Sequence, residues 1–502
     1  MNVPDGGFDY DAVVVGAGFG GLGAAITLVE NGWRVLLLEA LTYPGGCAST
    51  FMRQGWRFET GATLFSGFGE GHVFRGWMER HGLDVRVDPL DPAIVFRMPG
   101  AEIAVPASRD ALVERFCALP GAPVAGVRSF FDAQRRAADA LWALFDDPSL
   151  LPPFRPDMLL RHAVRLHRYL PIATLVGKPL LHVLRAHGVD GFAPLRTYLD
   201  ALCQITVQTG VAEAEAPFAL AATDYAFRGT GHVHGGIGVL ARALCDAVAR
   251  GGGDIRYASR VTRLERCGAG WRVHGRGREV TAAHVVCNLL PQGIQALTDT
   301  TTTGLDAEAA RVEEGWGAVM LYLGLRPTSE LPEHARHVEI VQDPEQPLIE
   351  GNHLFCSLSA ADEPERGPVQ PGGNARTVTV STHVSVSRLR ALGTEGQAAL
   401  VREAQQRMRD GIRAFAPEID GAIVHSMTAS PRTWQRFTRR PHGLVGGVPR
   451  RAGLHNYTGF VPAPVLPRLW MVGDTAFPGQ STLCVAIGGR KVAERIVEHG
   501  RA

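Results

Sequence analysis

The chain has 502 residues, of which 45% are hydrophobic and 20% are charged, and its formal net charge is +1. This length allows two or three domains with buried cores. A net charge close to zero excludes a global field that would draw nucleic acid or acidic partners to the surface. The eight cysteines are dispersed without a Cys-x-x-Cys pair, so neither a metal site nor an iron–sulfur site is predicted.

The N-terminal segment, Met1 to Tyr10, has no cationic stretch ahead of an apolar one, so it does not have the pattern of a secretory signal. No run of about 18 uncharged apolar residues is present, so no membrane-spanning segment is predicted. Scattered single cysteines are typical of a reducing compartment. Together these features predict a cytoplasmic protein.

The first predicted element is a strand over Asp11–Val15, followed by Gly16-Ala17-Gly18-Phe19-Gly20-Gly21 and a helical pattern. Gly16 permits the sharp turn, Gly18 has no side chain to block a pyrophosphate, and Gly21 lets the helix lie close to the strand. The helix N-terminus offers unpaired N–H groups and a partial positive charge to phosphates. This order predicts a dinucleotide site, whereas the alternative is a glycine-rich turn in an unrelated α/β protein.

A second apolar strand, Arg34–Leu38, ends at Glu39, which is 18 residues after Gly21. An acidic side chain at this place accepts hydrogen bonds from ribose hydroxyls and repels a 2′-phosphate. The first 40 residues therefore predict a fold for FAD or NAD and not for NADP.

The later segments follow in an order that predicts a divided nucleotide domain. Residues 108–224 are largely helical in pattern, residues 229–291 return to the dinucleotide-type pattern, and residues 301–450 mix strands and helices. A Pro/Gly-rich segment, Asp362–Asn374, predicts a mobile loop. The chain closes with a strand over 469–472, the pair Gly473-Asp474 and a helix near 483–496.

The predicted fold class is therefore α/β, with a Rossmann-type FAD-binding domain and an inserted mixed α+β substrate domain. The predicted division is the FAD-binding domain in residues 1–106, 229–300 and 451–502, a helical substrate- and membrane-facing region in 107–228, and the substrate-domain sheet and helices in 301–450.

Two further motifs favour a flavin over a nicotinamide. Gly45-Gly46 lies shortly after the ribose-binding acid, where backbone must pass close beneath a diphosphate. Asp474 follows a short strand and precedes a helix, so its carboxylate is placed for ribitol hydroxyls, and the helix N-terminus would stabilise the negative charge of a reduced flavin. Taken alone, Asp474 is also explained as an ordinary helix-capping residue.

These motifs resemble those of the phytoene desaturase and carotenoid isomerase family of flavoproteins. The resemblance is carried by residues 44–51, Gly61-Ala62-Thr63 and residues 473–480, and it extends to 195–200, 235–237, 430–433 and 446–447. The N-terminal block is most similar to the carotenoid 3′,4′-desaturase branch. The flavin motifs are specific for the wider family, which shares its architecture with amine oxidases, and are less specific for the substrate.

The resemblance implies FAD as cofactor and a set of contact residues, while it leaves the catalytic residues unassigned. The implied FAD contacts are Gly16, Gly18, Phe19, Gly20, Gly21, Glu39, Ala40, Gly45, Gly46, Ser49, Val261, Gly473 and Asp474. The residues expected near the isoalloxazine ring are Gly61, Ala62, Thr63, Thr482, Leu483 and Val485. One departure is Cys47, because many relatives carry Arg at this position; a possible cationic phosphate partner is absent there.

Residues 151–188 contain six Lys or Arg and one acid among many leucines and valines. A basic amphipathic segment of this kind lies in a membrane interface, with its cations at anionic headgroups, and the alternative is a helix pair packed on the protein. Two other groups are predicted to be structural: His232 and His234 at a glycine loop, and a solvated rim formed by Arg432, Arg436, Arg439 and Arg440.

The predicted function is desaturation of a carotenoid or related polyisoprenoid by hydride transfer to FAD in an apolar tunnel. No second dinucleotide site is evident, so a quinone or oxygen is the expected acceptor. The alternatives are a cis–trans isomerase or a saturase on the same scaffold, a lipid-binding chaperone without flavin, and an amine oxidase.

Overall fold

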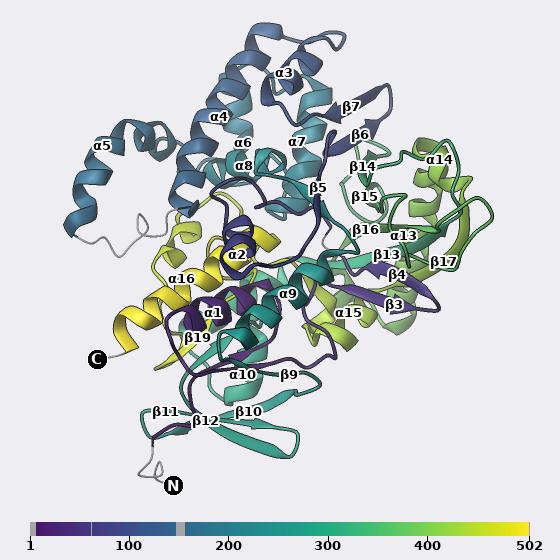
Figure 1. Cartoon of the computed structure of the whole chain (residues 1–502). Helices are drawn as coiled ribbons and strands as arrows, with labels where there is room; N and C mark the ends of the chain where they lie inside the picture. Colours follow the sequence, from purple (N-terminus) through teal and green to yellow (C-terminus); the bar gives the residue numbers. More distant parts are fainter. Residues whose placement is uncertain (1–6, 62, 147–155, 501–502) are drawn as a thin grey trace.

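The structure, a computed structural model, describes residues 7–61, 63–146 and 156–500 (Figure 1). Two large sheets organise these residues. In the first sheet, the strands follow the order β10-β11-β12-β1-β2-β9, and β19 also pairs with β12. The bounds of these strands are β1 Tyr10–Val15, β2 Val35–Leu38, β9 Asp254–Arg256, β10 Val261–Cys267, β11 Gly270–Gly275, β12 Arg278–Cys287 and β19 Leu469–Met471.

The centre of the first sheet is parallel, since β1 pairs in parallel with both β2 and β12. Side chains alternate between the two faces of β1, so Ala12 and Val14 pack against the helical layer, whereas Val13 and Val15 face the opposite core. The helical layer consists of α1 Phe19–Glu30, α9 Ile237–Arg250 and α16 Thr482–Gly500. A parallel sheet buried on both faces is the expected Rossmann-type arrangement, and the predicted fold class is confirmed.

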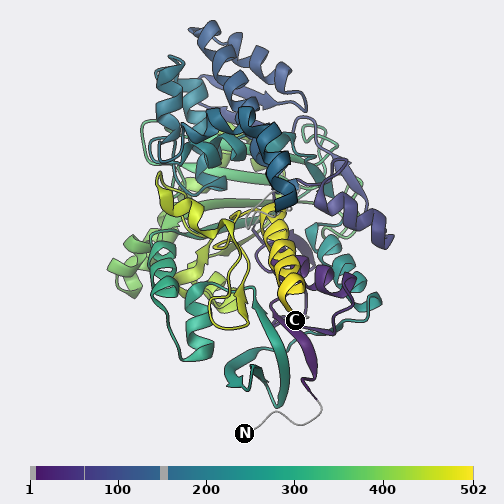
Figure 2. The same ribbon diagram turned by 90° about the vertical axis from the view of Figure 1, so that its left-hand side faces the viewer.

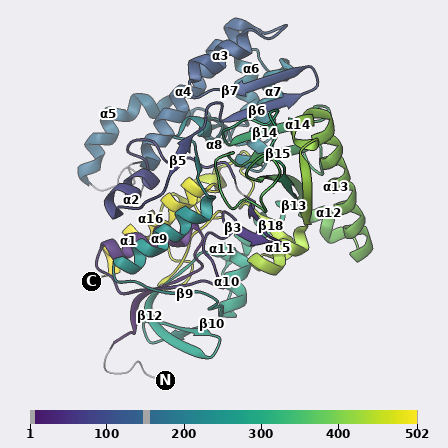
Figure 3. The same cartoon turned by 45° about the vertical axis from the view of Figure 1, so that its right-hand side comes forward.

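The second sheet has the order β17-β13-β16-β15-β14-β6-β7, with β18 paired to β13. Its bounds are β6 Ile94–Met98, β7 Ala101–Val105, β13 Trp316–Leu325, β14 Arg336–Val341, β15 His353–Leu358, β16 Arg376–Ser385, β17 Ile423–Ala429 and β18 Leu444–Val445. One face is covered by α13 Thr394–Phe415, beside α12 Val386–Ala391 and α14 Pro417–Asp420 (Figure 3). The other face is directed toward the first sheet.

A helical region lies beyond the two sheets, at the top of the view in Figure 1 and again in the turned view of Figure 2. Its helices are α3 Arg109–Cys117, α4 Val124–Asp146, α5 Pro156–Ala173, α6 Leu180–Ala186, α7 Ala193–Thr206 and α8 Ala216–Ala222. Several of these helices share one hydrophobic core with β6 and β7. Helix α5 instead extends outward from the rest of the molecule.

The remaining elements connect these layers. They are the hairpin β3 Thr50–Arg53 and β4 Trp56–Glu59, the pair β5 Val87–Pro89 and β8 Gly231–Val233, and the helices α2 Val73–His81, α10 Pro291–Thr298, α11 Thr303–Glu313 and α15 Pro431–Thr438. Short 3₁₀ helices span Tyr225–Phe227, Pro441–Gly443 and Leu454–Phe460.

Strand membership differs from the predicted division at one place. Residues 94–105 were assigned with the first part of the FAD-binding domain, but β6 and β7 belong to the second sheet because β6 pairs in parallel with β14. Nothing local in these residues distinguishes the two sheets, since the partner strand lies more than 200 residues further along the chain.

The segment predicted to be a mobile loop is anchored at its N-terminal end. Glu363 and Arg366 are 0% and 1% exposed, and they form an ion pair with each other. The first part of the segment is therefore fixed, whereas residues 367–374, which hold most of its glycines and prolines, are largely exposed. The charged side chains within it supply the anchor.

Candidate functional site

The glycine turn between β1 and α1 is closed by direct backbone contact. A Cβ atom on Gly21 would lie 2.0 Å from the carbonyl oxygen of Gly16, and one on Gly18 would lie 2.4 Å from Nδ2 of Asn288. The loop that carries Gly45 runs beside this turn, since the Gly45 N–H donates to the Ala17 carbonyl at 2.8 Å. Two stretches of glycine backbone therefore form a floor free of side chains, as a diphosphate requires.

Glu39 stands at the carboxyl end of β2, as predicted. Its Oε2 accepts the Ala17 N–H at 2.8 Å, and its Oε1 accepts the Leu41 N–H at 2.7 Å. Burial raises the pKa of Glu39, and the backbone N–H groups partly oppose that effect. These bonds hold the carboxylate at the edge of the glycine floor.

The C-terminal helix α16 brings the last motif to the same place. It packs along α1 (Figure 1) so closely that a Cβ on Gly489 would lie 2.0 Å from the Gly20 carbonyl, and one on Gly23 would lie 2.4 Å from the Ala486 carbonyl. As a result, the Gly473 nitrogen lies 3.0 Å from the position of a Cβ on Gly20. Residues 473–474 are thus adjacent to the first glycine turn.

The glycine turn, Glu39 and residues 473–474 all line one cavity of about 1580 Å³. It exceeds the roughly 300–1,000 Å³ that is usual for a single small-molecule site, so it has room for a long cofactor and a substrate together. The predicted cofactor residues that line it are Gly16, Gly18, Phe19, Gly20, Glu39, Ala40, Gly45, Gly46, Ser49, Gly61, Thr63, Val261, Gly473, Asp474, Thr482 and Val485. Glu39 and Asp474, which are more than 400 residues apart in sequence, thus line the same cavity.

Two predicted residues do not line the cavity, and the structure does not describe a third. Gly21 packs against the Gly16 carbonyl within the turn and does not line the cavity. Leu483 is 2% exposed in the core, because its position on α16 directs it away from the side that carries Thr482 and Val485. Ala62 lies outside the described residues. Direct contact of FAD with the lining residues stays a prediction.

Asn288 belongs to the site, although the sequence reasoning did not select it. It directly follows β12, and its side chain lies against Gly16, Gly18, Gly20 and Gly473. A polar residue at the carboxyl end of a parallel strand is the available signal, because ligands bind at this edge of open α/β sheets.

The second sheet forms the opposite wall of the cavity. Period-two alternation along β13 sends Val319, Leu321 and Leu323 to the core under α13, and Ala318, Met320 and Tyr322 to the cavity. The neighbouring strands add Phe355, Ser381, His383, Met427, Thr428 and Ala429. This wall is mainly apolar.

His383 is the titratable base among these wall residues. Its Nδ1 lies 3.4 Å from Nε2 of Gln204. Burial lowers the pKa of His383 to about 3, so the imidazole is neutral at physiological pH. Sequence reasoning missed this residue because it lies within an ordinary strand and in no motif.

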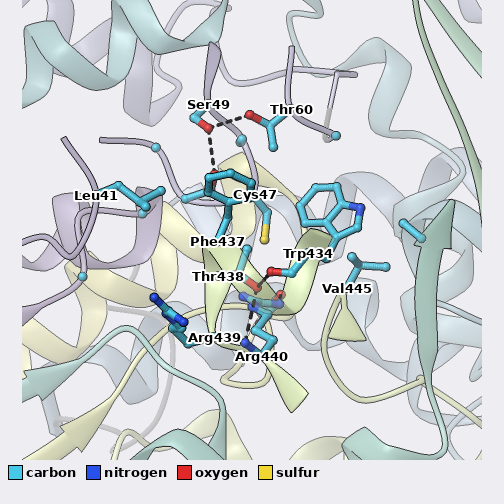
Figure 4. A pocket seen from close by; sticks show the side chains of 18 of the residues that line it. Leu41, Cys47, Ser49, Thr60, Trp434, Phe437, Thr438, Arg439, Arg440 and Val445 are labelled. Carbon is cyan, nitrogen blue, oxygen red and sulfur yellow. Dashed lines mark hydrogen bonds and ion pairs between the residues drawn. The ribbon is translucent and has the colours of Figure 1, made fainter. Parts of the chain in front are cut away.

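The arginines near α15 do not act as one group. Arg432, Arg436 and Arg439 are exposed, as expected for a solvated rim. Arg440 differs, since its side chain is 18% exposed and its Nη1 donates to Oδ2 of Asp474 at 2.6 Å. Figure 4 shows Arg440 at the cavity wall together with Cys47 and Trp434.

Comparisons with known proteins agree with this geometry. The chain belongs to the flavin-containing amine oxidoreductase family, whose sequence profile matches residues 19–369. FAD is the cofactor, and the predicted flavoprotein class, with its resemblance to carotenoid desaturases and isomerases, is confirmed. The glycine floor, Glu39 and Asp474 fit such a cofactor, because they supply a path for a diphosphate and acids for hydroxyl groups at two points along the cavity.

Several relatives align along almost the whole chain, and two of them represent the different activities named among them. Hydroxyneurosporene desaturase from Cereibacter sphaeroides is 28% identical over 97% of this chain and 97% of its own. Prolycopene isomerase 2, chloroplastic, from an Oncidium hybrid cultivar is 24% identical over 97% of this chain and 84% of its own. The structure of cyclohexylamine oxidase from Brevibacterium oxydans is 16% identical, covers 98% of this chain and 100% of its own, and has a TM-score of 0.61, which shows a shared fold.

Proposed function

We propose that this FAD-dependent oxidoreductase desaturates a carotenoid or a related apolar polyisoprenoid. The apolar wall of the second sheet carries this proposal, because it lies opposite the predicted cofactor floor across a single cavity. Among the described residues, this wall presents no carboxylate that would bind a cationic amine. The relative named as a hydroxyneurosporene desaturase supports the same substrate class.

The residues of the chain mainly bind and orient the substrate, and they exclude water from the site. The bound flavin supplies hydride acceptance, and a quinone or oxygen is the proposed final acceptor. Met320, Met427 and Phe355 give the wall adaptable apolar surface, which suits an extended hydrocarbon. Tyr322 is fixed because its hydroxyl donates to the Thr60 carbonyl at 2.6 Å, so it shapes the wall beside the cofactor floor.

Expression in cells that accumulate different carotenoid precursors tests the proposal, with the pigments separated by chromatography. A product with a longer conjugated system than the precursor is expected with the natural chain. A Gly21→Ala variant serves as the control without cofactor. If every precursor remains unchanged while the purified protein is yellow with bound flavin, the desaturase proposal is wrong.

A cis–trans isomerase is the second candidate, and the alignment with prolycopene isomerase over 97% of this chain favours it. Isomerisation leaves the substrate at the same oxidation level. Anaerobic enzyme with reduced flavin is therefore mixed with a cis-carotenoid, and the isomers are resolved by chromatography. Turnover without net oxidation supports the isomerase and excludes the need for an external acceptor. A saturated product would instead identify a saturase.

We also propose peripheral contact with a membrane through α5. Leu159, Leu160, Val164, Leu166 and Leu170 are 53–75% exposed on this outlying helix. Arg168 and Lys178 are exposed in and just beyond the same helix, so apolar and cationic groups reach solvent together. None of the helices within the described residues is long and apolar enough to cross a bilayer.

Co-sedimentation with lipid vesicles tests this contact. The natural chain is expected to bind vesicles that contain anionic phosphatidylglycerol more strongly than vesicles of phosphatidylcholine alone. A Leu160→Asp/Val164→Asp variant should lose at least about tenfold in partitioning, because burying a charge at the apolar face is unfavourable. Val369→Asp, at a site that is 86% exposed in a different region, is the matched control. Equal partitioning of all three proteins would contradict the proposal.

A further inference from the structure

Arg440 is held in the cavity by a rigid piece of backbone. Helix α15 ends at Thr438, and its C-cap residue Arg439 adopts a left-handed conformation with φ of 63°. The Arg440 N–H then donates to the Thr438 hydroxyl at 3.3 Å. Gly443 packs so tightly on Pro431 that a Cβ there would lie 2.1 Å from the Pro431 carbonyl oxygen. The loop therefore turns back on its own helix and directs Arg440 inward.

The guanidinium of Arg440 lies between two predicted parts of the cofactor site. On one side its Nη1 donates to Asp474 at 2.6 Å and to the Gly446 carbonyl at 3.3 Å. On the other side is Cys47, which directly follows the Gly45-Gly46 pair and whose sulfur points toward Arg440 in Figure 4. Burial alone would lower the pKa of Arg440, but Asp474 and Cys47 raise it overall, so the guanidinium stays charged.

This ion pair is incompletely satisfied by the protein. A guanidinium has five N–H donors, and only Nη1 has acceptors among the described residues. A buried ion pair repays the loss of hydration only when further hydrogen bonds complete it. Arg440 lines the cavity, so the open donors Nε and Nη2 have the cavity available to them.

The other cations that line the cavity are placed differently. Arg53, Arg242, Arg260, Arg432, Arg436 and Arg439 are exposed, and Arg57 is paired with Glu365 at 2.8 Å. Among the described residues, Arg440 is thus the cavity-lining cation that is both largely buried and bonded to a predicted cofactor residue.

We propose that Arg440 is a cofactor-binding residue, which donates its open N–H groups to an oxygen of FAD while it holds Asp474 in place for the ribitol hydroxyls. Arg440 supplies from the C-terminal part of the chain the cation that Cys47 does not supply from the N-terminal loop. The inference concerns FAD alone and does not depend on the identity of the substrate.

Titration of apoprotein with FAD, followed by flavin fluorescence, tests the inference. Arg440→Gln is expected to raise the Kd for FAD by about 10- to 100-fold, the usual range for loss of hydrogen bonds from a charged group. Arg440→Lys should give a smaller loss, because it keeps the charge without the planar fork. Arg402→Gln, at an exposed position on α13 that does not line the cavity, should leave the Kd unchanged. An unchanged Kd in folded Arg440→Gln would overturn the proposal.

A second pair of variants separates binding from folding. Arg440→Gln leaves Asp474 unpaired, so Arg440→Gln/Asp474→Asn removes both charges, and thermal unfolding of each apoprotein reports its stability. Cys47→Arg in the Arg440→Gln background returns a cation from the opposite wall, and it is expected to recover at least tenfold in FAD affinity. If FAD affinity falls only in step with apoprotein stability and Cys47→Arg restores none of it, Arg440 has a structural role and the proposal fails. Carotenoid turnover does not enter these readouts, so they are independent of the proposed activity.

Discussion

The glycines of the first turn act through the space that a side chain would fill. A Cβ on Gly21 would lie 2.0 Å from the Gly16 carbonyl oxygen, whereas nothing lies within 4 Å of a Cβ on Gly191, where the backbone is not left-handed. A methyl group is therefore excluded at position 21 and tolerated at position 191.

We expect Gly21→Ala to lower the free energy of unfolding by about 2 kcal/mol or more, since overpacking against a rigid backbone costs about 1–3 kcal/mol. The variant should also lose the visible absorbance of bound flavin. Urea denaturation and the absorbance of the purified protein measure the two effects. Gly191→Ala is the control, and equal stability of the two variants would contradict the packing argument.

Lys491 is the residue with the clearest pH signature. It is 6% exposed on α16, its Nζ donates to the Phe460 carbonyl at 2.5 Å, and burial lowers its pKa to about 7 from 10.5. Between these two pKa values the unfolded chain binds the proton and the folded chain does not, so stability rises with pH across this window. Below pH 7 both states are protonated, and the full cost of the buried charge applies.

The natural chain should therefore gain stability relative to Lys491→Met as the pH rises from 7 toward 10.5. The gain should not exceed about 5 kcal/mol, because each pKa unit corresponds to about 1.4 kcal/mol. Urea denaturation of both proteins at several pH values isolates this residue, since all other titrating groups are common to the pair. A constant difference across the window would show that Lys491 is charged in the folded state.

At the scale of elements, helix α9 receives its N-terminal partners from the β3–β4 hairpin. The Gly238 N–H donates to the Thr50 hydroxyl at 2.9 Å, and the Ile237 N–H donates to Oε2 of Glu59 at 3.3 Å. These acceptors satisfy N–H groups that a helix leaves open at its start. The hairpin thereby fixes the direction of a helix almost 190 residues away in sequence.

Thr50→Val removes this acceptor with little change in shape, and we expect it to destabilise the protein by about 1–3 kcal/mol because a buried N–H loses its partner. Thr303→Val, at an exposed position at the start of α11, is the matched control and should change stability by less than about 0.5 kcal/mol. Thermal or urea unfolding measures both. A loss no greater than that of the control would show that water replaces the hydroxyl.

At the scale of the whole molecule, a buried charge network joins the segment after β15 to the β3–β4 hairpin and to the turn before α9. Arg366, in the irregular segment of the substrate domain, bonds Glu363 through its Nε at 2.8 Å and lies 3.5 Å from Glu59 of β4. Glu363 in turn accepts the Gly235 N–H at 2.8 Å, just before α9. Although burial opposes it, the His232 hydrogen bond and Arg366 lower the pKa of Glu363.

Arg366→Met should destabilise the protein by about 3–5 kcal/mol at pH 7, because it leaves buried carboxylates without a cation. The contribution of Glu363 is present above its unfolded pKa of about 4.5 and is lost as the pH falls through the lower folded value, so the difference should shrink in acid. Chemical denaturation at pH 7 and at about pH 2.5, which lies inside this window, measures the change. Arg413→Met is the control. The Arg413 side chain is 63% exposed in its ion pair with Asp410, so this variant should lower the free energy of unfolding by less than about 1 kcal/mol.

The order of the elements and the presence of a dinucleotide site could be predicted from the sequence, because their signals are local. The spacing of Gly16, Gly18 and Gly21 after an apolar strand specifies a close approach of backbone within one turn. The continuous apolar run over residues 318–323 likewise predicts a strand with two buried faces. Such patterns depend only on neighbours in the chain.

What only the tertiary structure decided is which distant side chains meet at the cavity. Asn288, His383 and Arg440 carry no motif, and they reach the cavity because β12, β16 and the loop after α15 end there. Leu483 and the strands β6 and β7 were misplaced for the same reason, since helix rotation and strand pairing are settled by packing between remote segments. Long-range contacts, unlike turns and periodicities, are properties of the folded chain as a whole.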